Sequence, residues 1–441
     1  MSGKRTIMIN TVLLTMSSLA IRIVGMIFQA WLASHIGAAG IGLYQLTGSI
    51  TVLFSVFAVS GVRFAATRLV SEEITSQPCC IREAMRRCII YALLFGVLSF
   101  VILYSAAVPI GFLWVGDARV VLSLRLAALA FPFLALSAAF TGYFTACSQI
   151  RKIVSVQLLS SASNIAAVVY FLKHTDLLNL ERTCAAITAG SVIAEIVGAA
   201  FLTAFYRADR RNWVKAVHTH SHLTKRLLAA ALPLAFSSYA RTALNTLEHV
   251  LIPSKLQKAG LSAESSLAGY GAVHGMALPA VLFPACLLFS LSELIIPELT
   301  KEQVQGNHKR ICHIVRRCRA GTILYALITA FVIYLLANPI AETVFHTPEC
   351  AQHIRALAPL MIVMNLDTIT DGCLRGLGQQ QLVMAINILD AALGVVLVSL
   401  LLPRFGLTGY LQMIWITESV NCILSTLTLN HVLEKEKASG R

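Results

Sequence analysis

Three arginines lie inside long apolar stretches of the sequence, where a charged side chain needs a specific reason to be kept. Arg22, Arg63 and Arg241 each fall within such a stretch. An ionised group at the centre of a membrane-spanning helix costs about 2.5–3.5 kcal/mol, so it is expected beside a partner or a water-filled cavity. A guanidinium keeps its charge and offers a planar fork of donors that fits phosphate oxygens. These residues predict an anion-binding site into which a diphosphate would fit.

Two pairs of an amide and a carboxylate predict a second kind of site. Asn245 precedes Glu248 by three residues, and Asn387 precedes Asp390 by the same spacing. Residues three apart share one face of a helix, so each pair places its oxygens side by side. Oxygen ligands suit a hard cation, and a carboxylate can also carry a proton. The pairs predict coupling to Na+ or H+ without a resident cofactor, and whether they form one shared site stays open.

One further group has the residue type, although not the setting, of a metal site. His218, His220 and His222 alternate within a basic loop that spans residues 207–226. Alternate residues of a polar loop are typically solvated rather than bound to zinc. We therefore predict no metal site.

The elements that carry these residues are long and apolar. Of the 441 residues, 57% are hydrophobic and 13% are charged, whereas a soluble domain has about 25% charged residues. Apolar stretches of about 20 residues, enough to cross a bilayer core of about 30 Å, recur along the whole chain. This pattern predicts an all-α, polytopic membrane protein with about twelve transmembrane helices. The predicted spans are residues 9–33, 43–70, 88–108, 120–146, 153–172, 183–206, 227–252, 267–296, 320–337, 355–376, 382–402 and 407–430.

The basic residues behind the net charge of +14 are concentrated on one side of the predicted membrane topology. Most Lys and Arg residues lie at the two termini and in the loops that follow the even-numbered spans. Because cytoplasmic loops carry the excess of these residues, both termini are expected to face the cytoplasm. The basic charge therefore gives no reason to expect a nucleic-acid partner, and the lipid bilayer is the expected surrounding.

The two halves of the chain match each other at an offset of 230 residues. Arg86, Arg87 and Cys88 fall on Arg316, Arg317 and Cys318, and further matches follow at Tyr104, Pro109, Arg125, Gly142 and Gln149. This repeat predicts two parallel six-helix lobes, residues 1–220 and 221–441, around a central cavity. Parallel repeats with substrate bound between them are typical of transporters, although a duplicated structural bundle would show the same repeat.

The repeat also places opposite charges at equivalent positions. Glu293 falls on Arg63 at this offset. An ion pair between them that forms on one side of the membrane and breaks on the other could act as a gate. A permanent interior pair is the alternative, and Arg63 could instead extend its long side chain to the membrane surface.

Six runs of sequence, spread in order over nearly the whole chain, resemble a known family. They are residues 34–46 (SHIGAAGIGLYQL), 68–72 (RLVSE), 245–253 (NTLEHVLIP), 270–279 (YGAVHGMALP), 357–360 (LAPL) and 376–379 (GLGQ). Together they resemble the stage V sporulation protein B group, which belongs to the superfamily of polysaccharide flippases and multidrug exporters.

The resemblance implies a bacterial plasma-membrane flippase that moves a polyprenyl-diphosphate-linked saccharide, a peptidoglycan or polysaccharide precursor, by alternating access. In similar flippases cavity arginines on helices one, two and seven or eight hold the diphosphate, which matches Arg22, Arg63 and Arg241. Their helix-seven carboxylate of the cation site matches Glu248, and Asn387 with Asp390 resembles the helix-eleven part. Those flippases usually have fourteen helices, so with about twelve either the lipid tail lies between the lobes or the substrate differs.

The main alternative function is a cation-coupled multidrug exporter of small organic cations, which also has twelve helices in this superfamily. Arg22 argues against it, whereas Glu195 and the acidic second half argue for it. The loops are too short to hold a catalytic domain, so we expect no enzyme. A monomer is expected.

Overall fold

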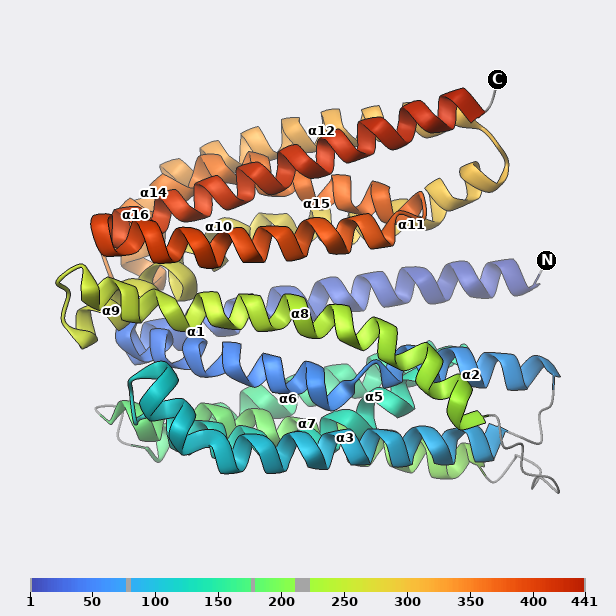
Figure 1. Cartoon of the computed structure of the whole chain (residues 1–441), viewed down its shortest axis with the longest axis horizontal. Helices are drawn as coiled ribbons and strands as arrows, with labels where there is room; N and C mark the ends of the chain where they lie inside the picture. The colour runs from blue at the N-terminus through green and yellow to red at the C-terminus, as the bar shows by residue number, and fades with distance from the viewer. Residues whose placement is uncertain (1, 77–80, 176–178, 211–222, 440–441) are drawn as a thin grey trace. The chain divides into compact units, whose positions relative to one another are not determined.

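The structure, a computed structural model, describes residues 2–76, 81–175, 179–210 and 223–439, and every regular element in these ranges is a helix (Figure 1). A chain in hydrocarbon finds no water for its backbone N–H and C=O groups, and a helix satisfies these groups internally. The predicted all-α membrane class is confirmed.

The helices of the first half are α1 (Ser2–Val59), α2 (Val62–Ser76), α3 (Ile81–Pro109), η2 (Ile110–Val115), α4 (Val120–Ala128), α5 (Phe131–Ala146), α6 (Ile150–Lys173) and α7 (Leu180–Arg210). Those of the second half are α8 (Leu223–Lys258), α9 (Ala263–Tyr270), η3 (Gly271–Ala277), α10 (Leu278–Leu282), η4 (Phe283–Ala285), α11 (Cys286–Val304), α12 (His308–Leu335), α13 (Ala337–Pro339), η5 (Ile340–Val344), α14 (Cys350–Leu357), η6 (Ala358–Leu360), α15 (Met361–Gly376) and α16 (Gln380–Ser439).

The number of membrane crossings follows from helix length. Within the described ranges, nine helical stretches are long and apolar enough to cross a membrane, and the pair α4 and α5, bent by 42°, makes a tenth. Two of the nine, Leu19–Ile74 and Gln380–Lys435, have 56 residues each, or about 84 Å of helix, against a core of about 30 Å. Each supplies two crossings, so the described residues supply twelve, as predicted.

Each of the two long stretches turns at a glycine. Gly37 has φ 71° and ψ 176°, and Gly406 has φ 57° and ψ −134°. A side chain with a Cβ atom is disfavoured at these positive φ values, whereas glycine adopts them readily. The sequence predicted a loop of residues 34–42 between the first two spans, but the chain there is helical except at Gly37.

The chain divides into two compact units by its internal contacts. Unit 1 comprises Met1–Ser17 and Leu46–Thr246, and unit 2 comprises Ser18–Gln45 and Leu247–Arg441. The division by contacts therefore falls at other residues than the predicted lobes, 1–220 and 221–441. The two parallel lobes around a central cavity stay a prediction.

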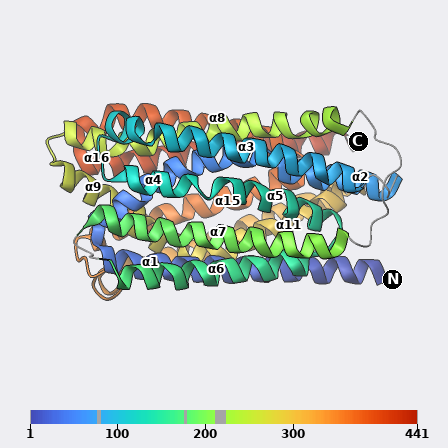
Figure 2. The same cartoon turned by 90° about the horizontal axis from the view of Figure 1, so that it is seen from below.

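Unit 1 is built around α5. This helix packs against α2, α3 and α7, and α6 packs on the far side of α7 (Figure 2). Its core contains small and aromatic side chains, including the buried Ala135, Ala139 and Tyr143. A Cβ atom added to Gly142 would lie 2.5 Å from the carbonyl oxygen of Arg63. Close backbone contact, typical of membrane helix packing, thus fixes α2 against α5.

Unit 2 packs α11, α12 and α16 around α15. Leu299, Ile311, Cys373 and Leu429 from these four helices meet in its core. Residues Ser18–Gln45 of α1 belong to this unit. The part of α1 that follows the turn at Gly37 is in close contact with α9 and η3: a Cβ atom added to Gly42 would lie 2.2 Å from the carbonyl oxygen of Leu267.

We expect this contact to be sensitive to a single methyl group. Gly42→Ala should lower the free energy of unfolding by about 1–3 kcal/mol, because the added Cβ overlaps backbone atoms that have no free space to move into. Gly25→Ala is the matched control, since nothing lies within 4 Å of its added Cβ, and alanine favours a helix over glycine by about 1 kcal/mol. Thermal unfolding of the purified protein measures both; equal stability of the two variants would contradict the contact.

Candidate functional site

Arg22 lies in unit 2, in the first crossing of α1, and has an acidic and an aromatic neighbour on α11. Its Nη2 atom is 3.9 Å from Glu293 Oε1, and its guanidinium carbon lies 5.1 Å from the centre of the Phe289 ring. The side chains of Arg22 and Glu293 are 46% and 52% exposed. Because the contact is long and half of the Arg22 side chain is uncovered, its guanidinium has donors left for another anion.

Arg63 and Arg241 lie in unit 1. Arg63 is the second residue of α2, and Arg241 lies on α8; both are exposed, and neither makes an ion pair with any described residue. A hydrogen bond of 2.6 Å from Tyr239 to Ser60 Oγ places α8 beside the break that precedes Arg63. Arg63 and Arg241 therefore lie on helices that are in contact with each other. The charge of each arginine is uncompensated among the described residues.

The break between α1 and α2 is held by hydroxyl groups. Ser60 (φ 43°) and Gly61 (φ 71°) leave the helical conformation there. Tyr91 donates a hydrogen bond of 3.0 Å to the carbonyl oxygen of Ser60, and its hydroxyl lies 2.9 Å from Ser60 Oγ. Unpaired backbone groups are costly in a low-dielectric interior, so these hydroxyls stabilise the backbone directly before Arg63.

Unit 2 gathers carboxylates from α8, α15 and α16. Glu248 and Asp390 interact electrostatically with each other, and Glu418 interacts with both of them and with Asp367. A Cβ atom added to Gly394 would lie 2.4 Å from Glu248 Oε2, so glycine leaves the room that this carboxylate occupies. The structure therefore places Glu248 and Asp390 close enough to interact, whereas the sequence had left open whether the two residues meet.

The two asparagines of the predicted pairs, unlike the carboxylates, do not lie in one unit. Asn387 donates a hydrogen bond of 2.7 Å to the carbonyl oxygen of Val383. Asn245 belongs to unit 1, whereas Glu248 belongs to unit 2. Within the described ranges no three His, Cys, Asp or Glu side chains are arranged to hold a metal ion, and His218, His220 and His222 lie outside those ranges. The role of Asn245, Glu248, Asn387 and Asp390 in coupling stays a prediction.

The predicted gate joins residues of different units. Arg63 belongs to unit 1 and Glu293 to unit 2, and the gate stays a prediction. Sequence reasoning missed the pairing of Glu293 with Arg22. The 271 positions that separate these two residues, which lie in different copies of the repeat, leave no local pattern that could have indicated it.

An aromatic cluster around the buried Tyr270, which includes the chain neighbour of Glu248, His249, was also missed. The ring centres of His249 and His274 are 4.4 Å apart, and Tyr270 stacks on His274 at 5.4 Å. The Tyr270 hydroxyl lies 3.3 Å from His249 Nδ1. His274 is part of the π-helical segment η3, and such segments are frequent at functional sites.

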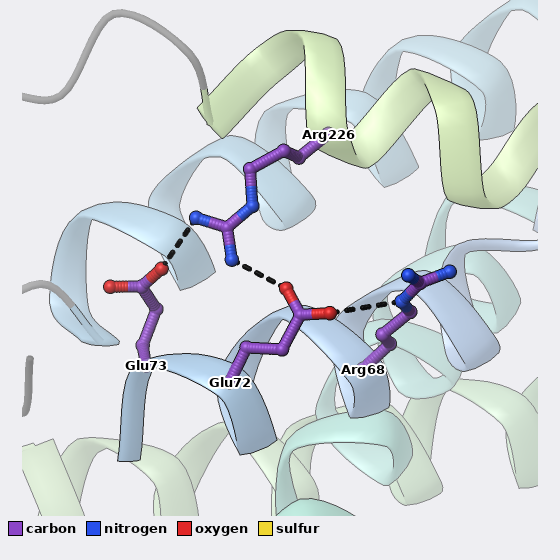
Figure 3. Close-up of polar contacts among 4 residues, drawn as sticks. All are labelled: Arg68, Glu72, Glu73 and Arg226. Carbon is purple, nitrogen blue, oxygen red and sulfur yellow. Dashed lines mark hydrogen bonds and ion pairs between the residues drawn. The ribbon is translucent and has the colours of Figure 1, made fainter. Parts of the chain in front are cut away.

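An ion-pair network ties the start of α8 to the end of α2 in unit 1 (Figure 3). Arg226 Nη1 donates a hydrogen bond of 2.8 Å to Glu73 Oε1, and its Nη2 donates to Glu72. Arg68 donates to the other oxygen of Glu72 at 3.0 Å. Glu73 is only 3% exposed, so Arg226 is the counter-charge that makes its burial tolerable.

Comparisons with known proteins agree with this architecture. The profile of the family described as "Polysaccharide biosynthesis protein" matches residues 7–302, and that of the family MatE matches residues 259–400. Stage V sporulation protein B of Bacillus subtilis (strain 168) is 19% identical over 418 residues, which cover 92% of this chain and 80% of that protein. Sporulation protein YkvU of the same organism is 21% identical and covers 79% and 77%.

Solved structures share the fold. An inward-facing multidrug resistance transporter of the MATE family, in the MOP superfamily, superposes with a TM-score of 0.76 at 12% identity and covers 96% of this chain and 99% of that one. A MOP superfamily transporter from Pyrococcus furiosus, described as having a binding pocket of reverse polarity, gives 0.66 at 15% identity and covers 97% and 96%.

The Arg226 network yields a stability prediction. Arg226→Gln should lower the free energy of unfolding by about 1–3 kcal/mol, because it leaves the buried carboxylate of Glu73 without its counter-charge. Adding Glu73→Gln should recover part of the loss, since the uncompensated charge is then removed. Arg68→Gln, on the exposed edge of the network, is the control and should cost less than about 1 kcal/mol. Thermal unfolding in detergent gives the ranking, and an Arg226→Gln variant as stable as Arg68→Gln would disprove it.

Proposed function

The chain belongs to the polysaccharide biosynthesis protein family, and from this membership we propose that it is a flippase for a polyprenyl-diphosphate-linked saccharide in the bacterial plasma membrane. It is a multi-pass membrane protein with the fold of MOP superfamily transporters. The saccharide would be a peptidoglycan or other polysaccharide precursor. Stage V sporulation protein B, a relative by sequence, adds a role in sporulation to this proposal.

The observation that carries the proposal is the state of Arg22. It lies in a membrane-crossing helix and is charged, yet its only ion pair among the described residues, with Glu293, is long and half exposed. Bringing a dianion into a low-dielectric interior without a counter-charge costs several kcal/mol. A guanidinium that can exchange Glu293 for phosphate oxygens lowers that cost. Arg63 and Arg241, which make no ion pair with any described residue, would supply further positive charge.

The proposed cycle is alternating access. The diphosphate head enters a cationic cavity between the two lobes from the cytoplasm, the lobes rock, and the head leaves on the outer side while the lipid tail stays in the bilayer. Both termini would face the cytoplasm, as the distribution of Lys and Arg predicts. The pair of Arg63 and Glu293 would act as a gate.

The ion that resets the cycle would bind at the carboxylates of unit 2. Glu248 and Asp390 interact electrostatically, and two like charges in one low-dielectric site favour uptake of a cation or a proton. Asn245 and Asn387 would add amide oxygens. Na+ or H+ is the proposed coupling ion.

A second candidate function is export of small organic cations. The same four carboxylates, Glu248, Asp367, Asp390 and Glu418, could neutralise such a substrate, and the matching of the MatE profile to residues 259–400 supports this candidate. The two functions demand opposite charges at the substrate site, so loss of arginine separates them.

Loss of the arginines should abolish flipping. We expect Arg22→Ala and Arg241→Ala each to reduce flipping of a polyprenyl-diphosphate-linked saccharide in proteoliposomes at least tenfold, because the head group loses a charge-assisted hydrogen-bond donor. Thermal unfolding should change little, since neither side chain is buried. Arg151→Gln, an exposed arginine of α6, is the control. Normal flipping by both alanine variants, or export of organic cations that survives in both, would refute the flippase assignment.

Loss of the Glu248 carboxylate on α8 should uncouple the cycle. Glu248→Gln keeps the shape of the side chain and removes its charge, so flipping should no longer depend on a Na+ or proton gradient. Glu264→Gln, an acidic residue at the start of α9 outside the carboxylate cluster, serves as the control and should keep the dependence. The initial rate measured with and without each gradient decides the matter, and an unchanged dependence in Glu248→Gln would exclude this residue from coupling.

A further inference from the structure

The two arginines of the repeated Arg-Arg-Cys motif have a carboxylate partner in the first copy but not, among the described residues, in the second. In the first copy, near the start of α3, Arg87 Nε donates a hydrogen bond of 3.2 Å to Glu83 Oε1, and Arg86 Nη1 lies 3.7 Å from Glu83 Oε2. Arg87 also donates to the hydroxyl of Thr224. One carboxylate, one turn earlier on the same helix, thus compensates both arginines.

The second copy lacks this carboxylate. At the repeat offset of 230, the position of Glu83 is taken by His313. Arg316 and Arg317 are exposed, and no described carboxylate lies within ion-pair distance of either. The exchange of a carboxylate for an imidazole therefore leaves two guanidinium groups of α12 uncompensated.

A cavity of about 570 Å³ opens at this place, between the end of α11 and the start of α12. Lys309, Arg310, His313 and Arg317 line it, and Glu298 is the only carboxylate among the described residues of its lining. Glu298 lies 3.8 Å from Arg310, which also contacts Glu302 at 3.2 Å. Arg310 is thus already paired, whereas no ion pair within the described chain involves Lys309 or Arg317. The lining carries three cations against one carboxylate, so the cavity favours an anion.

The surface next to the cavity is apolar. Leu324, Ile328 and Phe331 lie on the same face of α12 as Arg317. Leu324 follows Arg317 by seven residues, about two helical turns, and Ile328 and Phe331 follow at the further spacings of four and three residues. They are 62%, 56% and 65% exposed, in a helix apolar enough to cross a membrane. A cationic cavity at the end of a membrane helix, continued by an exposed apolar stripe, is complementary to an amphiphile with an anionic head.

We propose that this cavity binds the phosphate head group of an anionic phospholipid, with the acyl chains along Leu324, Ile328 and Phe331. Basic pockets at the ends of membrane helices suit such head groups, because their Lys and Arg side chains attract the anionic phosphate. Arg317 can grip two phosphate oxygens with its planar fork, and Lys309 adds a point charge. The bound lipid would be a resident of the membrane and distinct from the transported saccharide.

The difference between the two motif copies supplies the test. His313→Glu should restore the carboxylate that compensates Arg316 and Arg317, whereas His313→Gln removes the imidazole without adding charge. We expect phosphatidylglycerol, titrated into the purified full-length protein in neutral detergent, to raise the unfolding temperature of the wild type and of His313→Gln. His313→Glu and the double variant Lys309→Gln/Arg317→Gln should bind at least tenfold more weakly, since each basic residue near a lipid head group contributes substantially to affinity.

Two further ligands decide between sources of the phosphate, and a third measurement controls for the loss of charge elsewhere. Phosphatidylcholine, which is neutral overall, should give no comparable shift. Inorganic phosphate at the same concentration should also give none, and an equal shift would assign the cavity to free phosphate and overturn the lipid proposal. Arg151→Gln/Arg207→Gln removes two exposed charges from α6 and α7 and should bind as the wild type does. Equal affinity of His313→Glu and His313→Gln would overturn the proposal, whatever the result of the flipping assays.

Discussion

The bilayer core solvates no charge, and the placement of charged groups in this protein follows from that constraint. Each ionised side chain in a crossing helix needs a counter-charge, a hydrogen-bond partner or access to water. Glu73 has Arg226, and Asp367 accepts a hydrogen bond of 3.1 Å from Asn421. The arginines that keep little or no compensation among the described residues, Arg22, Arg63 and Arg241, are therefore the groups for which a function has to be sought.

The same constraint shapes the backbone. Helices that must satisfy their own hydrogen bonds can break only where something else stabilises the break. At Ser60 the hydroxyls of Tyr91 and Tyr239 do so, and at Gly37 the missing side chain permits a positive φ. Close helix contacts at Gly42 and Gly142 then fix the crossings against each other within each unit.

Much of the fold could be predicted because its signals are local. The length and apolarity of each stretch predicted twelve crossings, whereas the division into two six-helix lobes from the repeat at offset 230 stays a prediction. Contacts between distant segments could not be predicted. Arg22 meets Glu293, and Glu248 meets Asp390, across more than 140 positions each, and no periodicity records such pairs. The exchange of Glu83 for His313 was visible in the sequence, yet its meaning required the ion pairs that Glu83 makes.

The central claim is that membrane-embedded arginines bind a diphosphate head group. Mass spectrometry of the intact protein in detergent can measure the affinity of a polyprenyl diphosphate saccharide beside that of the corresponding uncharged polyprenol. A preference of at least tenfold for the diphosphate in the wild type, lost when Arg22 and Arg241 are both replaced by glutamine, is the predicted result. Equal affinity for the two lipids, or a preference for the diphosphate that survives the double replacement, would contradict the claim.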